Sequence, residues 1–308
     1  MARETMEFFA DALVRIICAP FAGALALAVM IRIAGSSGSG RRIASAGIGL
    51  AFAWSAAMIF GAPEIPPAPG PDGLVSVAAV GLILGTLFDI YGQRDSTRSA
   101  RVSSGITGWL ADWRGWLEWT LILAFGGGTA AWMQEEIGST GPVITGLWGL
   151  AVLRLRHVFG KNNDTLAGDA LVPLAMLMMA AAGLALTAAA ANSASDRDLA
   201  LALAAAIAGF LALSLFDRSL GFGLTPVLGA AGSVLAVAVR IADADRYLIP
   251  AVAVLGFIFY ADTLFRQPAL ARCAGLRWGR LGLVVLGALV PIALAATAAL
   301  VGVGFTRN

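Results

Sequence analysis

Residues 168–216 read GDALVPLAMLMMAAAGLALTAAAANSASDRDLALALAAAIAGFLALSLF. Two apolar runs, at about 168–190 and 199–216, are each long enough to cross the hydrocarbon core of a bilayer as a helix, and a short polar turn joins them. The alanines at 180–182 and 188–191 would let the backbones of neighbouring helices approach closely. This stretch therefore predicts a transmembrane helical hairpin.

Apolar runs separated by short polar connections continue in both directions along the 308 residues. The chain is 59% hydrophobic and 13% charged, whereas a soluble domain is typically about 45–50% apolar and about a quarter charged. Much of the surface must face lipid. We expect an all-α, polytopic transmembrane helical bundle that forms a single domain over residues 1–308, with about ten helices and eight as the alternative. The predicted spans are 12–33, 43–61, 73–91, 117–133, 142–158, 168–190, 199–216, 222–239, 247–264 and 281–303.

Positive charge alternates between dense and nearly empty connections. One face collects fifteen basic side chains, and the positive-inside rule assigns that face to the cytoplasm, so both termini are predicted to be periplasmic. The bias toward arginine over a single lysine, with abundant alanine and glycine, indicates a bacterial source and hence the bacterial cytoplasmic (inner) membrane. The fifteen side chains are those of Arg32, Arg41, Arg42, Arg94, Arg98, Arg101, Arg114, Arg154, Arg156, Lys161, Arg218, Arg266, Arg272, Arg277 and Arg280.

Two spans end in similar sequences. Residues 85–89 read GTLFD and residues 213–217 read LSLFD, and each stretch follows a hairpin of two apolar segments. This similarity predicts a four-helix unit repeated in the same orientation, at 41–158 and 167–266, flanked by the first and last helices.

The acidic residues nearest to the spans fall at their cytoplasmic ends. Asp89, Asp217 and Asp262 all end spans there, with Arg218 adjacent to Asp217 and Arg266 four residues after Asp262. The favoured interpretation is that these residues form interfacial ion pairs, which contribute little to stability. The functional alternative is a cytoplasmic gate or a site for an anionic headgroup. The centres of the spans lack ionisable residues, which disfavours a buried proton relay.

At the other face, Asp11 and Arg15 are four residues apart and form a similar pair near the start of the first span. An aromatic stripe lies in the longest internal connection, where Trp109, Trp113 and Trp116 share one face of a predicted helix. We expect this segment to lie in the headgroup region before turning into the fourth span, as an interfacial anchor. A lipid or quinone headgroup site is the alternative.

Motifs for chemistry are lacking. The sequence contains no G-x-S-x-G nucleophile motif, no P-loop lysine and no H-E-x-x-H motif, so we expect no catalytic residue, metal or cofactor, and an enzyme is not favoured. The function expected from span number is a secondary permease or lipid/small-molecule transporter. The alternatives are a non-catalytic scaffold or accessory subunit of a membrane complex and, third, an intramembrane lipid-modifying enzyme.

The expected partners are the bilayer, with anionic headgroups at the cytoplasmic face, and either other membrane proteins or a second copy of the chain. Nucleic acid is not expected, because the basic residues are dispersed over many connections rather than gathered in one stripe.

Overall fold

The computed structural model describes residues 12–35, 39–61, 71–99, 106–133, 146, 149–151, 154–155, 170–217, 220–267, 270 and 276–306. Within these ranges every long element is a helix. The elements are η1 (Val14–Cys18), α2 (Ala19–Ala34), α3 (Ser39–Ile43), α4 (Ala46–Phe60), α5 (Pro71–Ser99), α6 (Ile106–Met133), α8 (Leu171–Ala190), α9 (Ala194–Phe216), α10 (Leu224–Pro226), η3 (Val227–Ala231), α11 (Gly232–Ala244), η4 (Arg246–Leu248), α12 (Ile249–Leu255), η5 (Gly256–Arg266) and α14 (Arg277–Thr306).

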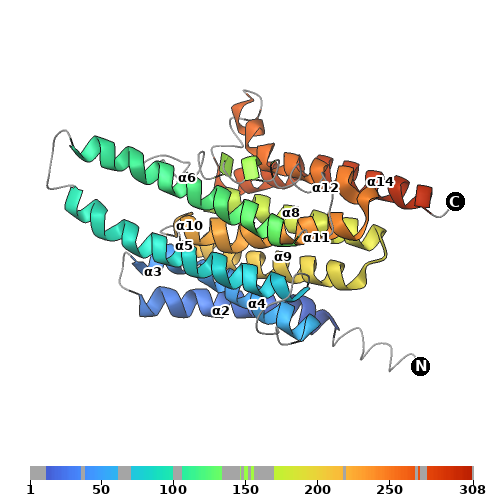
Figure 1. The fold of residues 1–308 in the computed structure, drawn as a ribbon, viewed down its shortest axis with the longest axis horizontal. Helices are drawn as coiled ribbons and strands as arrows, with labels where there is room; N and C mark the ends of the chain where they lie inside the picture. Colours follow the sequence, from blue (N-terminus) through green and yellow to red (C-terminus); the bar gives the residue numbers. More distant parts are fainter. Residues whose placement is uncertain are drawn as a thin grey trace.

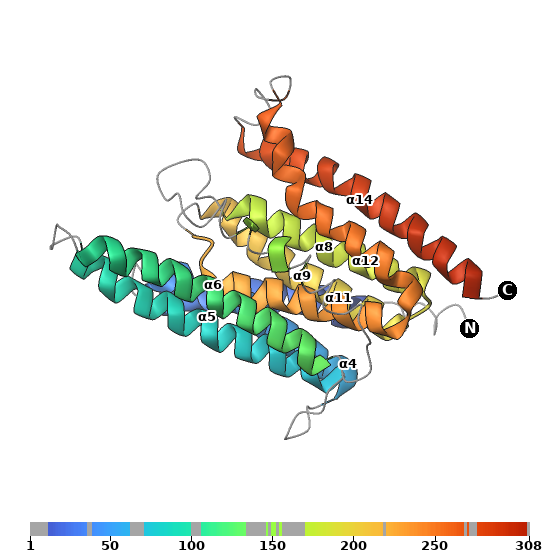
Figure 2. The same cartoon turned by 45° about the horizontal axis from the view of Figure 1, so that its top comes forward.

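The bundle is built around three enclosed helices. In Figure 2, α8, α9 and α11 lie between a flank formed by α5 and α6 and an opposite flank formed by α12 and α14. Nearly every side chain of the continuous helical stretch Leu224–Ala244 is buried, whereas much of α2 and α14 is exposed. Because the exposed side chains on these outer helices are mostly apolar, the outer surface of the bundle is suited to lipid.

Seven helices in the described part of the chain are long and apolar enough to cross a membrane, and α4 is a shorter apolar helix of 15 residues. The prediction of an all-α transmembrane bundle is therefore confirmed, and the chain is a multi-pass membrane protein. The predicted hairpin at 168–216 is α8 and α9, whose connecting turn contains Asn192 in the left-handed conformation, with φ of 59°. Asparagine is one of the few residues that ends a helix in this way.

The two ends of the bundle can be distinguished by what gathers there. The start of η1 and the end of α14 lie at the same end in Figure 1, which we call the terminal end. The opposite end, which holds Arg32 and Arg154, is called the basic end. The number of ten crossings, which includes segments outside the described residues, stays a prediction.

The fifth predicted span, 142–158, lies mostly outside the described residues. The helices before and after it, α6 and α8, are described. Helix α6 lies beside α11, with Phe125 against Gly232 and Gly126 against Leu235, and it runs toward the terminal end of the bundle in Figure 2. Helix α8 begins at the basic end, because its antiparallel partner α9 ends there. The crossing at 142–158 stays a prediction.

Two spans contain wider, π-helical turns. One is η1, which ends two residues before Pro20, a residue with no N–H to donate to the preceding turn. The other is η3, directly after Pro226, in the most enclosed span. Pro291 lies inside the last span, and α14 continues through it from Arg277 to Thr306.

Candidate functional site

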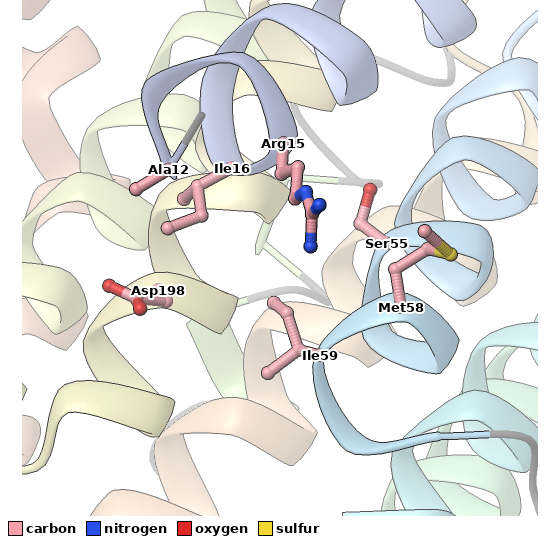
Figure 3. Close-up of a pocket in the computed structure, with 7 residues that line it drawn as sticks. All are labelled: Ala12, Arg15, Ile16, Ser55, Met58, Ile59 and Asp198. Atoms are coloured by element: carbon pink, nitrogen blue, oxygen red, sulfur yellow. The ribbon is translucent and has the colours of Figure 1, made fainter. Parts of the chain in front are cut away.

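A pocket of about 300 Å³ opens at the terminal end of the bundle. It lies between the first helical turns of the chain, α4 and the start of α9, as Figure 3 shows. The lining residues in the described part of the chain are Ala12, Arg15, Ile16, Ser55, Met58, Ile59 and Asp198. The walls are thus apolar apart from one cation, one carboxylate and one hydroxyl, which is the usual character of a small-ligand site.

Arg15 supplies the cation from the π-helical turn η1. Its side chain extends from that turn into the space above Ile59, with Ser55 on one side and Asp198 across the pocket (Figure 3). The neighbouring side chains Leu13 and Val14 are more than half exposed and apolar. The same turn therefore presents apolar groups to lipid and a guanidinium to the pocket. π-helical turns occur frequently at functional sites.

Asp198 supplies the carboxylate from the first turns of α9. Its Oδ1 accepts two hydrogen bonds from Arg197, from Nε at 2.9 Å and from Nη2 at 2.8 Å. Ser55, on α4, is buried and donates its hydroxyl to the carbonyl of Ala51 at 2.8 Å. Since its only hydrogen is used in that bond, Ser55 can offer the pocket only acceptor lone pairs.

A buried ion pair supports the same end of α9. Asp196 is almost fully buried, accepts from Arg240 Nε at 2.5 Å and accepts from the hydroxyl of Ser193 at 2.7 Å. The Arg240 guanidinium also lies 5.2 Å from the centre of the Phe60 ring. These contacts join α9, α11 and α4, and so they hold the helices that carry Asp198 and Ile59 in place.

At the basic end, Asp89 caps another helix. Its Oδ1 accepts from the backbone N–H of Leu224 at 3.0 Å, and its Oδ2 accepts from the backbone N–H and the hydroxyl of Thr225 at 2.8 and 2.6 Å. The carboxylate therefore fills the positive N-terminal end of the span that begins at Leu224. Gly85 allows this approach, because a Cβ there would lie 2.7 Å from the Cα of Thr225.

Asp217 makes a different contact. It accepts from Arg32 Nε at 3.1 Å, and both side chains are partly exposed. Arg218, the neighbour in sequence, lies outside the described residues. Asp89 and Asp217 therefore bind different partners, a helix N-terminus and an arginine, and the structure does not bring the two carboxylates together in one site.

Asp262 is buried and pairs with Arg154. Arg154 donates to both carboxylate oxygens, at 2.5 and 3.2 Å, and to the carbonyl of Phe259 at 2.7 Å. Its guanidinium also stacks on Tyr260 at 4.3 Å from the ring centre. The side chain of Arg266 lies outside the described residues. The predicted pair of Asp262 with Arg266 therefore stays a prediction.

The predicted aromatic anchor falls on α6. Trp116 is 73% exposed there, and the side chains of Trp109 and Trp113 lie outside the described residues. The expected turn between the interfacial segment and the fourth span is absent, because Ile106–Met133 is one helix. The anchoring role stays a prediction.

The structure adds residues that sequence reasoning missed, namely Asp196, Arg240, Ser55 and Asp198. Each depends on helices that are distant in sequence, and only the position of Arg15 near the start of a span pointed toward this region. Among the described residues no three histidine, cysteine or acidic side chains gather closely enough to hold a metal. Comparison of the chain with protein-family models, with curated proteins and with solved structures finds no match.

Proposed function

We propose that the protein is a transporter of small or lipid-like molecules in the bacterial inner membrane, and that the pocket at the terminal end is its ligand site. The observation that carries the proposal is the position of Arg15, on a π-helical turn of a membrane-spanning helix and beside a pocket with mostly apolar walls.

Two physical arguments support this function. A charged side chain in a membrane-spanning helix is rare and costly, which makes such a residue a functional candidate by default. The pocket also lies beside the first span, which is the least enclosed of the seven, so molecules in the outer part of the bilayer have direct access to it. Under the positive-inside rule the pocket opens toward the periplasm.

The proposal is tested by flux. The full chain is purified and reconstituted into liposomes, and two measurements are made: dithionite quenching of fluorescent headgroup-labelled lipids, and counterflow of radiolabelled amino acids. We expect protein-dependent movement in at least one measurement, and we expect Arg15→Gln to reduce its rate at least tenfold. Arg41→Gln is the matched control, since Arg41 is exposed near the opposite end of the bundle. Folded protein without flux of any probe would reject transport.

A second candidate, a non-catalytic subunit of a membrane complex, is favoured by the enclosed hydroxyls. Thr187, Ser214 and Ser233 are buried, and each donates to the carbonyl four residues earlier in its own helix, at 3.0, 3.0 and 2.6 Å. Their hydrogens are therefore not offered to a substrate crossing the core. Purification from native membranes in mild detergent distinguishes the two, because a subunit brings a stoichiometric partner with it and an autonomous transporter does not.

A further inference from the structure

We propose that η5 is a conformational switch, a segment that Arg154 holds as a 3-10 helix and that becomes an α-helix when its contact with Arg154 is broken. The inference goes beyond the proposed function, because it does not depend on whether the protein transports a molecule. It concerns the span Arg246–Leu264, in which α12 is α-helical up to Leu255 and η5 continues the chain to Arg266.

The first observation is the length of η5. It contains 11 residues, whereas 3-10 helices longer than about 3–4 residues are uncommon, because their hydrogen-bond geometry is poorer than that of an α-helix. The sequence of η5, GFIFYADTLFR, contains no proline that would prevent an α-helix. A 3-10 stretch within a longer helix often marks a functional hinge. Contacts with the rest of the bundle must therefore stabilise this form.

The packing of η5 repeats every three residues. Phe257, Tyr260 and Thr263 are exposed, and the ring centres of Phe257 and Tyr260 are 6.5 Å apart. Leu264 instead faces α14, where a Cβ added to Gly287 would lie 2.7 Å from its Cδ1. Side chains three residues apart are aligned in a 3-10 helix, but they are offset by about 60° in an α-helix. The packing of η5 therefore matches the 3-10 form.

Arg154 is the side chain that holds this form. It donates to both carboxylate oxygens of Asp262, at 2.5 and 3.2 Å, and to the carbonyl of Phe259 at 2.7 Å, and its guanidinium stacks on Tyr260. The side chains of Arg154 and Asp262 are only 19% and 5% exposed, so separating them would leave both charges without a partner in a mostly apolar region. We call the contacts of Arg154 with η5 the latch.

Conversion to an α-helix would break the latch. An α-helix turns about 20° less and rises about 0.5 Å less per residue than a 3-10 helix. Counted from Phe257, Asp262 would therefore rotate by about 100° and move by about 2.5 Å along the helix axis. In the α-helical form Arg266, four residues after Asp262, has the spacing that favours a local ion pair. Asp262 thus has one partner for each form, Arg154 for the 3-10 helix and Arg266 for the α-helix.

The α-helical form is also compatible with lipid. Counted from the exposed Phe257, α-helical geometry places Ala261 and Leu264 on the lipid-facing side and turns Thr263 about 120° away from it. Ala261 and Leu264 are apolar, and the Thr263 hydroxyl could then donate to the carbonyl four residues earlier, as that of Thr187 does. Neither form of η5 therefore places a charged side chain in line with Phe257 on the lipid-facing side.

The switch is tested by the oxygen accessibility of spin labels on the full chain in liposomes. Nitroxide labels are attached singly to Thr263→Cys and Leu264→Cys in a Cys18→Ser, Cys273→Ser background, and collisions with oxygen are measured by electron paramagnetic resonance. The two positions are adjacent and differ little in depth, so the ratio of their accessibilities reports which one faces lipid. Without further changes we expect position 263 to be about twofold or more the more accessible. In Arg154→Gln we expect the reverse order.

Three further variants make the test specific to the latch. Arg240→Gln is the matched control, because it breaks another ion pair between a partly buried arginine and a buried aspartate, and it should keep the original order. Arg266→Gln should also keep this order, since Arg266 is the partner of Asp262 only in the α-helical form. Arg154→Gln combined with Asp262→Asn removes both charges of the latch, so no buried carboxylate loses its partner, and it should reverse the order. Circular dichroism and monodisperse elution verify that each variant is folded.

The proposal is overturned if the folded double variant keeps position 263 the more accessible, because the 3-10 form would then not depend on the latch. It is also overturned if position 264 is already the more accessible without any change to Arg154, or if Arg240→Gln reverses the order as Arg154→Gln does. The measurement requires no flux. Failure to transport any molecule would therefore reject the proposed function and leave this result unchanged.

Discussion

Replacing Asp89 by alanine should strongly destabilise the bundle at its basic end. The Asp89 carboxylate is 7% exposed and accepts three hydrogen bonds at the start of the span Leu224–Ala244, two from backbone N–H groups and one from the hydroxyl of Thr225. In Asp89→Ala both N–H groups remain buried without an acceptor, because the helix around them leaves no other partner at its first turn.

The expected loss follows from these contacts. A buried donor without a partner costs about 1–3 kcal/mol, an N-cap side chain contributes typically about 1 kcal/mol, and interhelical hydrogen bonds in membrane bundles contribute about 0.6–2 kcal/mol each. Two stranded amides therefore give a loss of about 3 kcal/mol for Asp89→Ala. Asp89→Asn keeps one acceptor oxygen and should lose about half as much, and Thr225→Val, which removes only the hydroxyl, should lose about 1 kcal/mol.

The assay is reversible unfolding of the purified chain in mixed micelles by increasing mole fraction of SDS, followed by tryptophan fluorescence. Arg41→Gln is the control, since Arg41 is exposed on α3. The order Asp89→Ala, Asp89→Asn, Thr225→Val, control, from least to most stable, supports the capping role. A stability of Asp89→Ala within about 0.5 kcal/mol of the wild type would refute the reasoning.

Three further predictions concern packing and ion pairs. Gly81→Ala should lower the free energy of unfolding by about 1–3 kcal/mol, because its Cβ would press on the carbonyl of a neighbouring helix. Gly127→Ala, which faces open space, should leave this free energy unchanged or raise it slightly through helix propensity. Equal effects of the two substitutions in SDS unfolding would contradict the assigned packing. Asp196→Ala should lower the free energy of unfolding by about 3–5 kcal/mol, because it leaves Arg240 without its buried partner. A double-mutant cycle with Arg240→Met should show a coupling energy that an independent pair would lack. Asp217→Asn should lower the free energy of unfolding by less than about 1 kcal/mol, since its ion pair with Arg32 is partly exposed. A larger loss in the same assay would show that this ion pair is buried in the membrane-embedded protein.

The spans were predictable from the sequence because lipid imposes a strong rule: a run of about 20 apolar residues must be helical to satisfy its backbone groups. Gly81 and Gly85, spaced as G-x-x-x-G, also pack closely against a neighbouring helix. A Cβ at Gly85 would clash with the backbone of Thr225, and Gly81 lies directly against the carbonyl of Leu228. Both are local properties of a helix, and local properties can be read from spacing.

The partners of the charged side chains were not predictable in this way. Spacing within a helix indicates only neighbours three or four residues apart, yet Asp262 pairs with Arg154, more than one hundred residues away, and Asp89 binds backbone N–H groups that no residue type reveals. The pocket escaped prediction for the same reason. Arg15 was recognisable near the start of a span, but its surroundings depend on the approach of α4 and α9.

The repeat predicted at 41–158 and 167–266 stays a prediction. One similarity between the two units is visible: Gly81 lies eight residues before Asp89, Gly209 lies eight residues before Asp217, and both glycines pack against a carbonyl of a neighbouring helix. The carboxylates themselves have diverged in their contacts, since one caps a helix and the other binds an arginine.

The orientation of the bundle determines which side of the membrane the pocket serves, and reporter fusions test it most directly. Alkaline phosphatase, which is active only in the periplasm, and a green fluorescent protein that is fluorescent only in the cytoplasm are each fused after Asn308 and, separately, within the 268–276 connection of the otherwise intact chain. An even number of crossings with the basic end inside predicts active phosphatase at Asn308 and fluorescence at 268–276. Fluorescence at Asn308 with active phosphatase at 268–276 would contradict the account, because the pocket and Arg15 would then face the cytoplasm.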